Sequence, residues 1–171
     1  MTVSTSIAVI AVGDRSRHDD GVGAAVLSRL RERADVRPLP PGTVLSECDL
    51  DPSRLIRLWE DAELAVVLEP AHARPGHPGR IYRLQLDAAE LGRPAAMSPH
   101  GLGEAVELAR VLGRLPGRLV AYAVDSGDTS LGQGLSEPVA TSVEALVRRV
   151  EDEIARHRVA AAPDTAGLGA A

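Results

Sequence analysis

Short apolar runs that end at glycine or at polar residues constrain the fold of this chain most. Residues 6–12 read SIAVIAV, residues 64–69 read LAVVLE and residues 118–124 read RLVAYAV. Runs of this length with β-branched residues are typical of strands that are buried on both faces. They predict the centre of a parallel sheet.

Helical patterns separate these runs along the chain. Apolar residues recur at helical spacing in residues 21–33, 52–59, 98–112 and 138–157. Two further strands are predicted at 43–47 and, at a sheet edge, at 80–86. Asp51 followed by Pro52 is a typical helix start. Strands that alternate with helices predict a single-domain, three-layer α/β fold with a mostly parallel twisted sheet of about five strands.

The length of 171 residues fits one ordinary domain. We assign residues 1–157 to this domain and predict that residues 158–171 form a disordered C-terminal tail. The formal net charge of −5 and the scattered arginines argue against nucleic acid as a partner. No stretch approaches the ~20 apolar residues that span a bilayer, and the first residues lack a charged targeting segment. We therefore expect a cytoplasmic protein without a membrane partner, and a monomer.

Polar side chains follow the predicted strands at three places. Asp19 and Asp20 come after the first strand, Glu69 ends a central strand, and His100 opens a helix. The carboxyl ends of parallel strands meet at one edge of a sheet, where functional groups gather. The sequence therefore predicts that these residues form one site.

Each of these residues also has a structural interpretation. Asp19 and Asp20 suit a helix cap. A salt bridge to Arg74 or Arg80 would explain Glu69, and His100 could bond to backbone in the first helical turn.

Three segments resemble the hydrogenase maturation protease family in order and spacing. They are AVGDRSRHDDGVGAAVLSRL, DPSRLIRLWEDAELAVVLEP and SPHGLGEAVELARVLG, and the resemblance extends to about residue 155. The Asp-Asp-Gly-x-Gly segment is moderately specific alone. Together with Ser-Pro-His-x-Leu-Gly about eighty residues later it is a strong signature.

The resemblance implies an aspartyl-type endopeptidase with a five-stranded twisted sheet. Such enzymes remove the C-terminal extension of the NiFe-hydrogenase large-subunit precursor after nickel insertion. By resemblance, Asp20, Glu69 and His100 are the nickel ligands, and the resting protease keeps no metal of its own. We expect Asp19 to support these ligands or to act as a base.

Nickel chemistry suits these residue types. Nickel accepts imidazole nitrogen and carboxylate oxygen, and three protein ligands leave positions open for the precursor's own ligands. A metal that polarises the scissile carbonyl, or a metal-bound water assisted by a carboxylate, is sufficient for peptide hydrolysis.

The sequence departs from the family pattern at three places. Asp14 replaces the usual asparagine after the first strand, Glu69 replaces an aspartate, and Cys48-Asp49-Leu50 stands where glycine is usual. The extra methylene of Glu69 moves its carboxylate by about 1.5 Å, and misplacements near 1 Å can cost on the order of 100-fold in rate. A silent homologue that binds the precursor or its nickel without cutting therefore remains an alternative.

Other functions and residues are less favoured. A nucleotide-binding α/β domain would need Gly-x-Gly-x-x-Gly or a Walker lysine, and the chain has neither. Ser126 and Ser130 lack the Gly-x-Ser-x-Gly elbow of a serine hydrolase. The remaining candidates have structural interpretations. We expect His18 to be a solvated loop residue, and His72 and His77 to lie on the rim of the cleft. Cys48 is expected to be a small buried residue.

Overall fold

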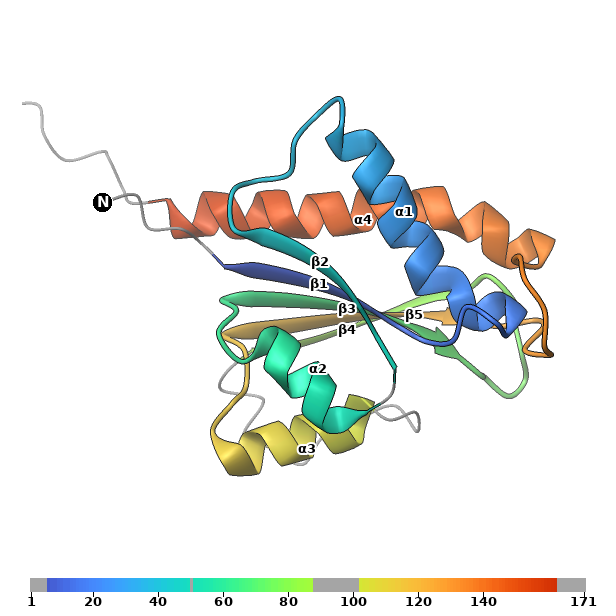
Figure 1. The fold of residues 1–171 in the computed structure, drawn as a ribbon, viewed down its shortest axis with the longest axis horizontal. Coiled ribbons are helices and arrows are strands. Elements are labelled where there is room, and N and C mark those ends of the chain that lie inside the picture. The colour runs from blue at the N-terminus through green and yellow to red at the C-terminus, as the bar shows by residue number, and fades with distance from the viewer. Residues whose placement is uncertain (1–5, 50, 88–101, 163–171) are drawn as a thin grey trace, which may run out of the picture.

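The computed structural model describes residues 6–49, 51–87 and 102–162. Five strands form one sheet in the order β2-β1-β3-β5-β4 (Figure 1). The three pairings among β2, β1, β3 and β5 are parallel, and β4 runs antiparallel to its neighbour β5. The strands are β1 (Ile7–Val12), β2 (Thr43–Cys48), β3 (Leu64–Ala71), β4 (Ile81–Asp87) and β5 (Arg118–Asp125).

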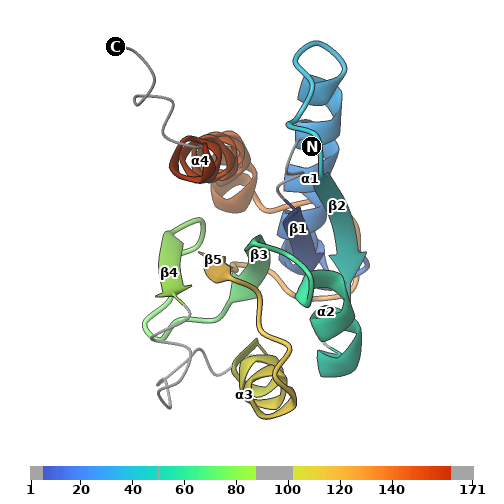
Figure 2. The ribbon, with the colours of Figure 1, turned by 90° about the vertical axis from the view of Figure 1, so that its left-hand side faces the viewer.

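Helices cover both faces of the sheet and complete the three layers (Figure 2). Two of them, α1 and α4, lie together on one face, and α2 and α3 lie on the other. The helices are η1 (a short 3-10 turn, His18–Gly21), α1 (Val22–Ala34), α2 (Pro52–Trp59), α3 (Leu102–Leu112) and α4 (Glu137–Ala161). The predicted single-domain α/β fold is confirmed.

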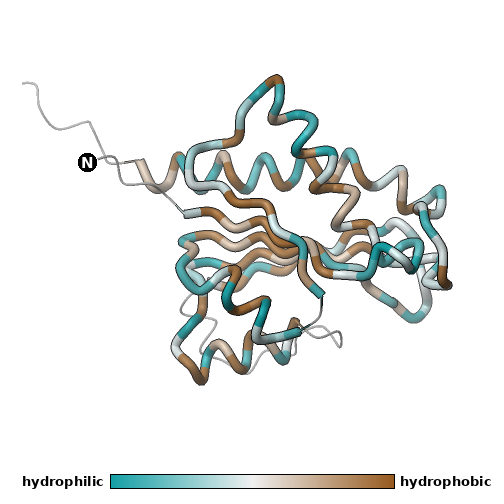
Figure 3. The backbone as a smooth tube through the Cα atoms, in the orientation of Figure 1, coloured by the Kyte–Doolittle hydropathy of each residue, from teal (hydrophilic) through white to brown (hydrophobic). Residues whose placement is uncertain are grey.

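Two apolar clusters, one on each face of the sheet, form the core. Strand β1 and residues 64–68 of β3 are hydrophobic throughout (Figure 3), as expected of strands with no solvent-facing side. Val9, Val66 and Val120 pack under α1 and α4, whereas Ile10 and Val67 pack under α2 and α3. Trp59 is fully buried and donates a hydrogen bond from its indole N–H to the Arg114 carbonyl at 3.2 Å.

Local sequence signals account for several element boundaries. Asp51 caps α2 as predicted, because its side chain accepts hydrogen bonds from the backbone N–H groups of Ser53 and Arg54 and Pro52 follows it. Strand β3 extends two residues past its predicted end at Glu69. Beyond Leu68 it pairs only with β5, an edge-like position that tolerates Pro70.

The C-terminal helix is longer than the sequence pattern indicates. It ends at Ala161 instead of residue 157, so the first residues of the predicted tail are helical. Valine and alanine follow Arg158, and alanine is the strongest helix former, which allows the helix to continue without an apolar stripe. Residues 163–171 lie outside the described residues. Among the helices described, none has the length and apolarity needed to span a membrane.

Candidate functional site

A small pocket of about 150 Å³ lies at the carboxyl ends of β1 and β3. The adjacent parallel strands bring together side chains that are far apart in the sequence. The residues that line the pocket are Val12, Gly13, Asp14, Asp20, Asp49, Glu69, Pro70 and His72. The predicted meeting of the first-strand and third-strand carboxylates at one edge therefore occurs for Asp20 and Glu69.

Glu69 is a buried carboxyl group that has no ionic partner among the described residues. It is 3% exposed, and its Oε2 atom has no hydrogen-bond partner. Burial raises its pKa from 4.5 to about 7. Within residues 6–49, 51–87 and 102–162 no ion pair joins it to Arg74 or Arg80, so the salt-bridge interpretation is wrong. The side chain is held by packing at the end of β3 and not by a counter-charge.

Asp20 places a second carboxylate oxygen in the same pocket. It lies in the 3-10 turn η1, and its Oδ1 atom is buried without a hydrogen-bond partner. Burial raises its pKa, while His72 and Arg17 favour its charged form; the neighbouring negative charge of Asp14 acts in the same direction as burial. Two carboxylates with unused oxygens thus face one small cavity, which suits a cation or a polarised group.

Backbone contact fixes the position of the Asp20 turn. Gly13, the residue after β1, has φ of +147°, and a Cβ atom there would overlap the Asp20 carbonyl oxygen. The Gly13 N–H donates to the Cys48 carbonyl at 3.2 Å. Glycine is therefore required at position 13 both by the backbone angle and by the close approach of η1.

Asp19 plays a different part from its neighbour. It is fully buried, and both its oxygens accept hydrogen bonds: from the N–H groups of Gly127 and Asp128 at 2.8 Å, and from the N–H and hydroxyl of Ser136 at 2.7 Å. Burial opposes ionisation, but these bonds outweigh it and hold the pKa of Asp19 below its usual value. Helix α1 is capped by Gly21 without a side-chain bond, so the capping interpretation of Asp19 and Asp20 is wrong. The geometry favours Asp19 as a support of the 127–136 loop over Asp19 as a base.

His100 lies outside the described residues, as does the start of the helix predicted from residue 98. The described part, α3, begins at Leu102, and its N-terminal end lies at the same end of the molecule as the carboxyl ends of the parallel strands (Figure 1). In the portion of the chain that is described, no group of three or more histidine, cysteine, aspartate or glutamate side chains is placed to hold a metal ion.

Asp125 escaped the sequence analysis, and Asp49 was named there only as a departure from the family pattern. Asp49 lines the pocket directly after β2. Asp125 is 1% exposed at the end of β5 and accepts hydrogen bonds from the backbone N–H groups of Ala73 and His77, which ties down the loop that carries His72. An acid at the end of an apolar run was the available signal, the same one that drew attention to Glu69.

The remaining histidines and the cysteine occupy structural positions or the pocket wall. His18 Nδ1 lies 2.9 Å from the Gly134 carbonyl oxygen, and His18 is not among the residues that line the pocket. His72 lines the pocket, as expected of a rim residue, whereas His77 is not among the lining residues. Cys48 is buried at the end of β2, as expected.

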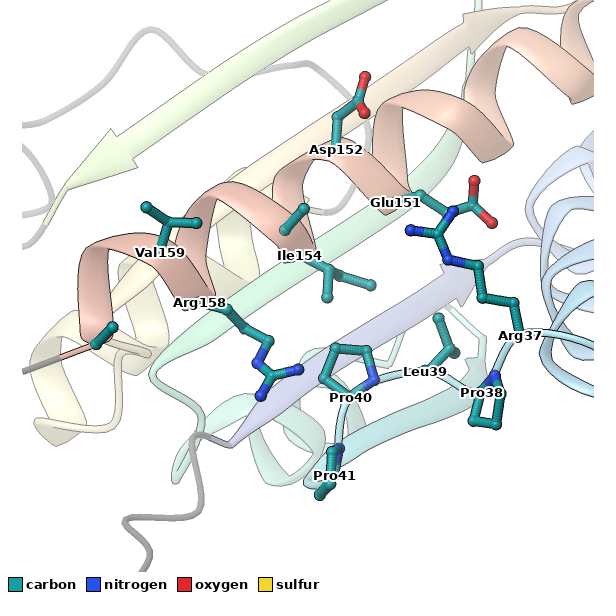
Figure 4. A pocket seen from close by; sticks show the side chains of 12 residues that line it. Arg37, Pro38, Leu39, Pro40, Pro41, Glu151, Asp152, Ile154, Arg158 and Val159 are labelled. Atoms are coloured by element: carbon teal, nitrogen blue, oxygen red, sulfur yellow. The ribbon is translucent and has the colours of Figure 1, made fainter.

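A larger groove of about 820 Å³ lies elsewhere, between the proline-rich segment 37–41 and the last turns of α4 (Figure 4). Figure 4 shows the Arg158 side chain reaching toward Pro40 across this groove. Two acids line it. Asp152 is exposed on α4, and Glu151 pairs with an arginine. Despite its size, the groove is therefore a less favourable place for catalysis than the pocket lined by Asp20 and Glu69, which we call the carboxylate pocket.

Comparison with known proteins finds likeness in structure only. No family model matches the sequence, and no curated protein matches it. Among solved structures, the hydrogenase maturating endopeptidase HybD from E. coli is similar with a TM-score of 0.71 and 20% identity, over 89% of this chain and 93% of that one. The NiFe-hydrogenase maturation protease HybD from Thermococcus kodakarensis gives 0.68 and 21%, over 87% and 99%. The hydrogenase 2 maturation peptidase from Thaumarchaeota archaeon SCGC_AB-539-E09 gives 0.63 and 24%, over 87% and 97%. At these identities the likeness establishes a shared fold.

Proposed function

We propose that this protein is an endopeptidase of hydrogenase maturation, which removes the C-terminal extension of a NiFe-hydrogenase large-subunit precursor and recognises the nickel already bound there. The fold is that of proteins named as such peptidases. The signature segments around Asp20 and His100 are those on which the sequence resemblance to that family rests. On this proposal the protein works in the cytoplasm as a monomer and keeps no metal between substrates.

The observation that carries the proposal is the pair of unpartnered carboxylate oxygens in one pocket. Burying Asp20 Oδ1 and Glu69 Oε2 without hydrogen bonds costs free energy that a purely structural role does not recover. A cation brought by the substrate would supply the missing partner for both. Because the pKa of Glu69 is about 7, nickel would displace a proton that this carboxyl readily gives up near neutral pH.

His100 is the proposed third ligand. It precedes α3 by two residues, and the N-terminal end of α3 lies at the pocket's end of the sheet. Imidazole nitrogen together with two carboxylate oxygens is a ligand set that nickel accepts, and three protein ligands leave positions for the precursor. Cleavage then requires that the precursor's peptide be held beside the ion, where its carbonyl is polarised and water attacks.

The second candidate function is binding without cleavage. It is favoured by Glu69, whose longer side chain places the carboxylate about 1.5 Å from where an aspartate would place it. Such a protein would hold the precursor or its nickel during maturation and release it at unchanged length.

A processing assay distinguishes these functions. Purified nickel-loaded precursor is incubated with the protein, with its His100→Ala variant and with a His77→Ala control, since His77 does not line the pocket. We expect the parent protein and the control to shorten the precursor, as measured by mass spectrometry, and the His100→Ala variant to leave its length unchanged. A shift on a native gel without shortening would favour the binding function. Unchanged processing by the His100→Ala variant would refute the proposed ligand set.

A further inference from the structure

The outer edge of β2 carries backbone groups that bond to no described residue. β2 is the last strand on its side of the sheet and pairs with β1 alone among the described strands (Figure 2). Gly13 N–H donates to the Cys48 carbonyl, so Cys48 faces β1. Because alternate residues of a parallel strand bond to the same neighbour, the N–H and C=O groups of Leu45 and Glu47 point away from β1. The N–H of Thr43 donates to a carbonyl of the preceding proline segment at 3.1 Å. We call residues 45–47 the open edge of β2.

This edge lacks the features that usually prevent pairing with another chain. Edge strands are commonly protected by proline, lysine or a bulge. β2 reads TVLSEC and pairs with β1 over six consecutive residues without a bulge. Its single charge, Glu47, is paired with Arg15, and Arg31 lies 3.7 Å from the same carboxylate. Val44 is 58% exposed and offers an apolar contact to a side chain of an added strand.

The open edge leads to the carboxylate pocket. Asp49 follows β2 directly and lines this pocket together with Asp20 and Glu69. A strand added beside β2 would lie one strand spacing, about 4.8 Å, beyond it and therefore roughly 10 Å from β1. Three extended residues, at about 3.3 Å each, span that distance. A chain that leaves the open edge can therefore reach the pocket within a few residues.

We infer that the open edge of β2 binds the segment of the precursor next to its cleavage site, which pairs with Leu45 and Glu47 as a sixth strand. The inference rests on the proposed function, because it takes the substrate to be a peptide chain that enters the carboxylate pocket. An extended segment presents N–H and C=O groups at the spacing of the open edge, and strand addition is a recurring mode of peptide recognition. The bond to be cut lies about three residues beyond the paired segment.

Hydrogen–deuterium exchange of single amides in the parent protein, measured by mass spectrometry, tests the inference. The probe is the nickel-loaded precursor of the processing assay, at a saturating concentration. We expect the amides of Leu45 and Glu47 to exchange about tenfold more slowly when the precursor is present, because they then donate to its carbonyls. The amides of Val44 and Ser46 face β1, so their exchange should change within about twofold.

A pair of variants at one position tests the same contact by kinetics. Glu47→Pro removes the outward N–H and no described backbone hydrogen bond, and proline is tolerated at a strand edge that faces solvent. Glu47→Ala is the matched control, since it removes the same side chain and its ion pairs but keeps the N–H. We expect Glu47→Pro to raise KM for processing about tenfold relative to Glu47→Ala and to leave kcat within about twofold, because strand pairing holds substrate and transition state equally. Equal thermal stability of the two variants shows that the fold is intact, and if Glu47→Pro does not fold, exchange in the parent protein decides.

The possible outcomes separate this inference from the proposed function. Shortening of the precursor with unchanged exchange at Leu45 and Glu47, or with equal KM for the two variants, would refute the inference alone. A precursor that neither binds nor is shortened would refute both. Slower exchange of the two amides in concentrated protein without precursor would identify a second copy of this chain as the occupant and overturn the inference. Protection on binding without shortening would support it together with the binding function.

Discussion

Replacing Glu69 by glutamine tests whether this carboxyl is as desolvated in solution as its position implies. Its burial raises the pKa from 4.5 to about 7. The folded protein thus binds the proton more tightly than the unfolded chain, so ionisation of Glu69 destabilises the fold as pH rises from 4.5 through about 7. Above this range the destabilisation amounts to about 3 kcal/mol, at 1.36 kcal/mol for each pKa unit.

Glutamine has nearly the same shape and no charge at any pH, so the Glu69→Gln variant escapes this destabilisation. We expect the free energy of unfolding of the variant, relative to the parent protein, to increase by about 2.5 kcal/mol between pH 5 and pH 8. Urea titrations followed by Trp59 fluorescence measure it, since Trp59 is fully buried. The matched control is Glu104→Gln, the same substitution at an exposed residue of α3 outside the pocket.

A pH-independent difference for Glu69→Gln would contradict the reasoning. It would mean that the Glu69 carboxyl is hydrated or hydrogen-bonded in solution. The missing partner of its Oε2 atom would then be no evidence for a cation site. The same titration is repeated with nickel salt. If ionised Glu69 binds nickel, the parent protein should become more stable above pH 7, and the Glu69→Gln variant should not.

Three other carboxylates give different expectations. Asp19→Asn should lower the free energy of unfolding by about 2–4 kcal/mol in urea titrations, because an amide N–H₂ would face N–H donors that the Asp19 carboxylate now accepts from. Asp20→Asn should change it by less than about 1 kcal/mol in the same titrations, because Asp20 Oδ1 accepts no hydrogen bond. Asp125→Asn should raise the hydrogen-exchange rates of the Ala73 and His77 amides about tenfold, measured by NMR, and leave β1 amides unchanged. Unaltered exchange would show that Asp125 does not hold the loop.

The sequence was most informative where burial alone decides structure. Runs such as residues 64–69 are short and rich in β-branched residues, which favours strands covered on both faces, and their alternation with helical patterns predicts a parallel sheet. Asp51 with Pro52 identified the start of α2, because capping depends on residues a few positions apart. The end of α4 was missed because alanine-rich sequence continues a helix without any apolar periodicity to reveal it.

At the site, sequence reasoning identified which residues share an edge but not what each one does. Asp20 and Glu69 were placed together because adjacent parallel strands end together. The role of Asp19 was missed, since its partners lie more than a hundred residues away and only tertiary contact brings them to it. Asp125 ends an apolar run as Glu69 does, but its bonds to the loop amides depend on tertiary contact that the sequence does not reveal.

Gly13 limits how the wall of the carboxylate pocket can change. The smallest residue already brings the backbone after β1 into contact with the turn that bears Asp20, so this wall has no room to move inward. Any larger residue at position 13 would meet the Asp20 carbonyl oxygen, so the turn that bears Asp20 would have to move. The distance between the Asp20 and Glu69 carboxylates is therefore set in part by a residue that has no side chain.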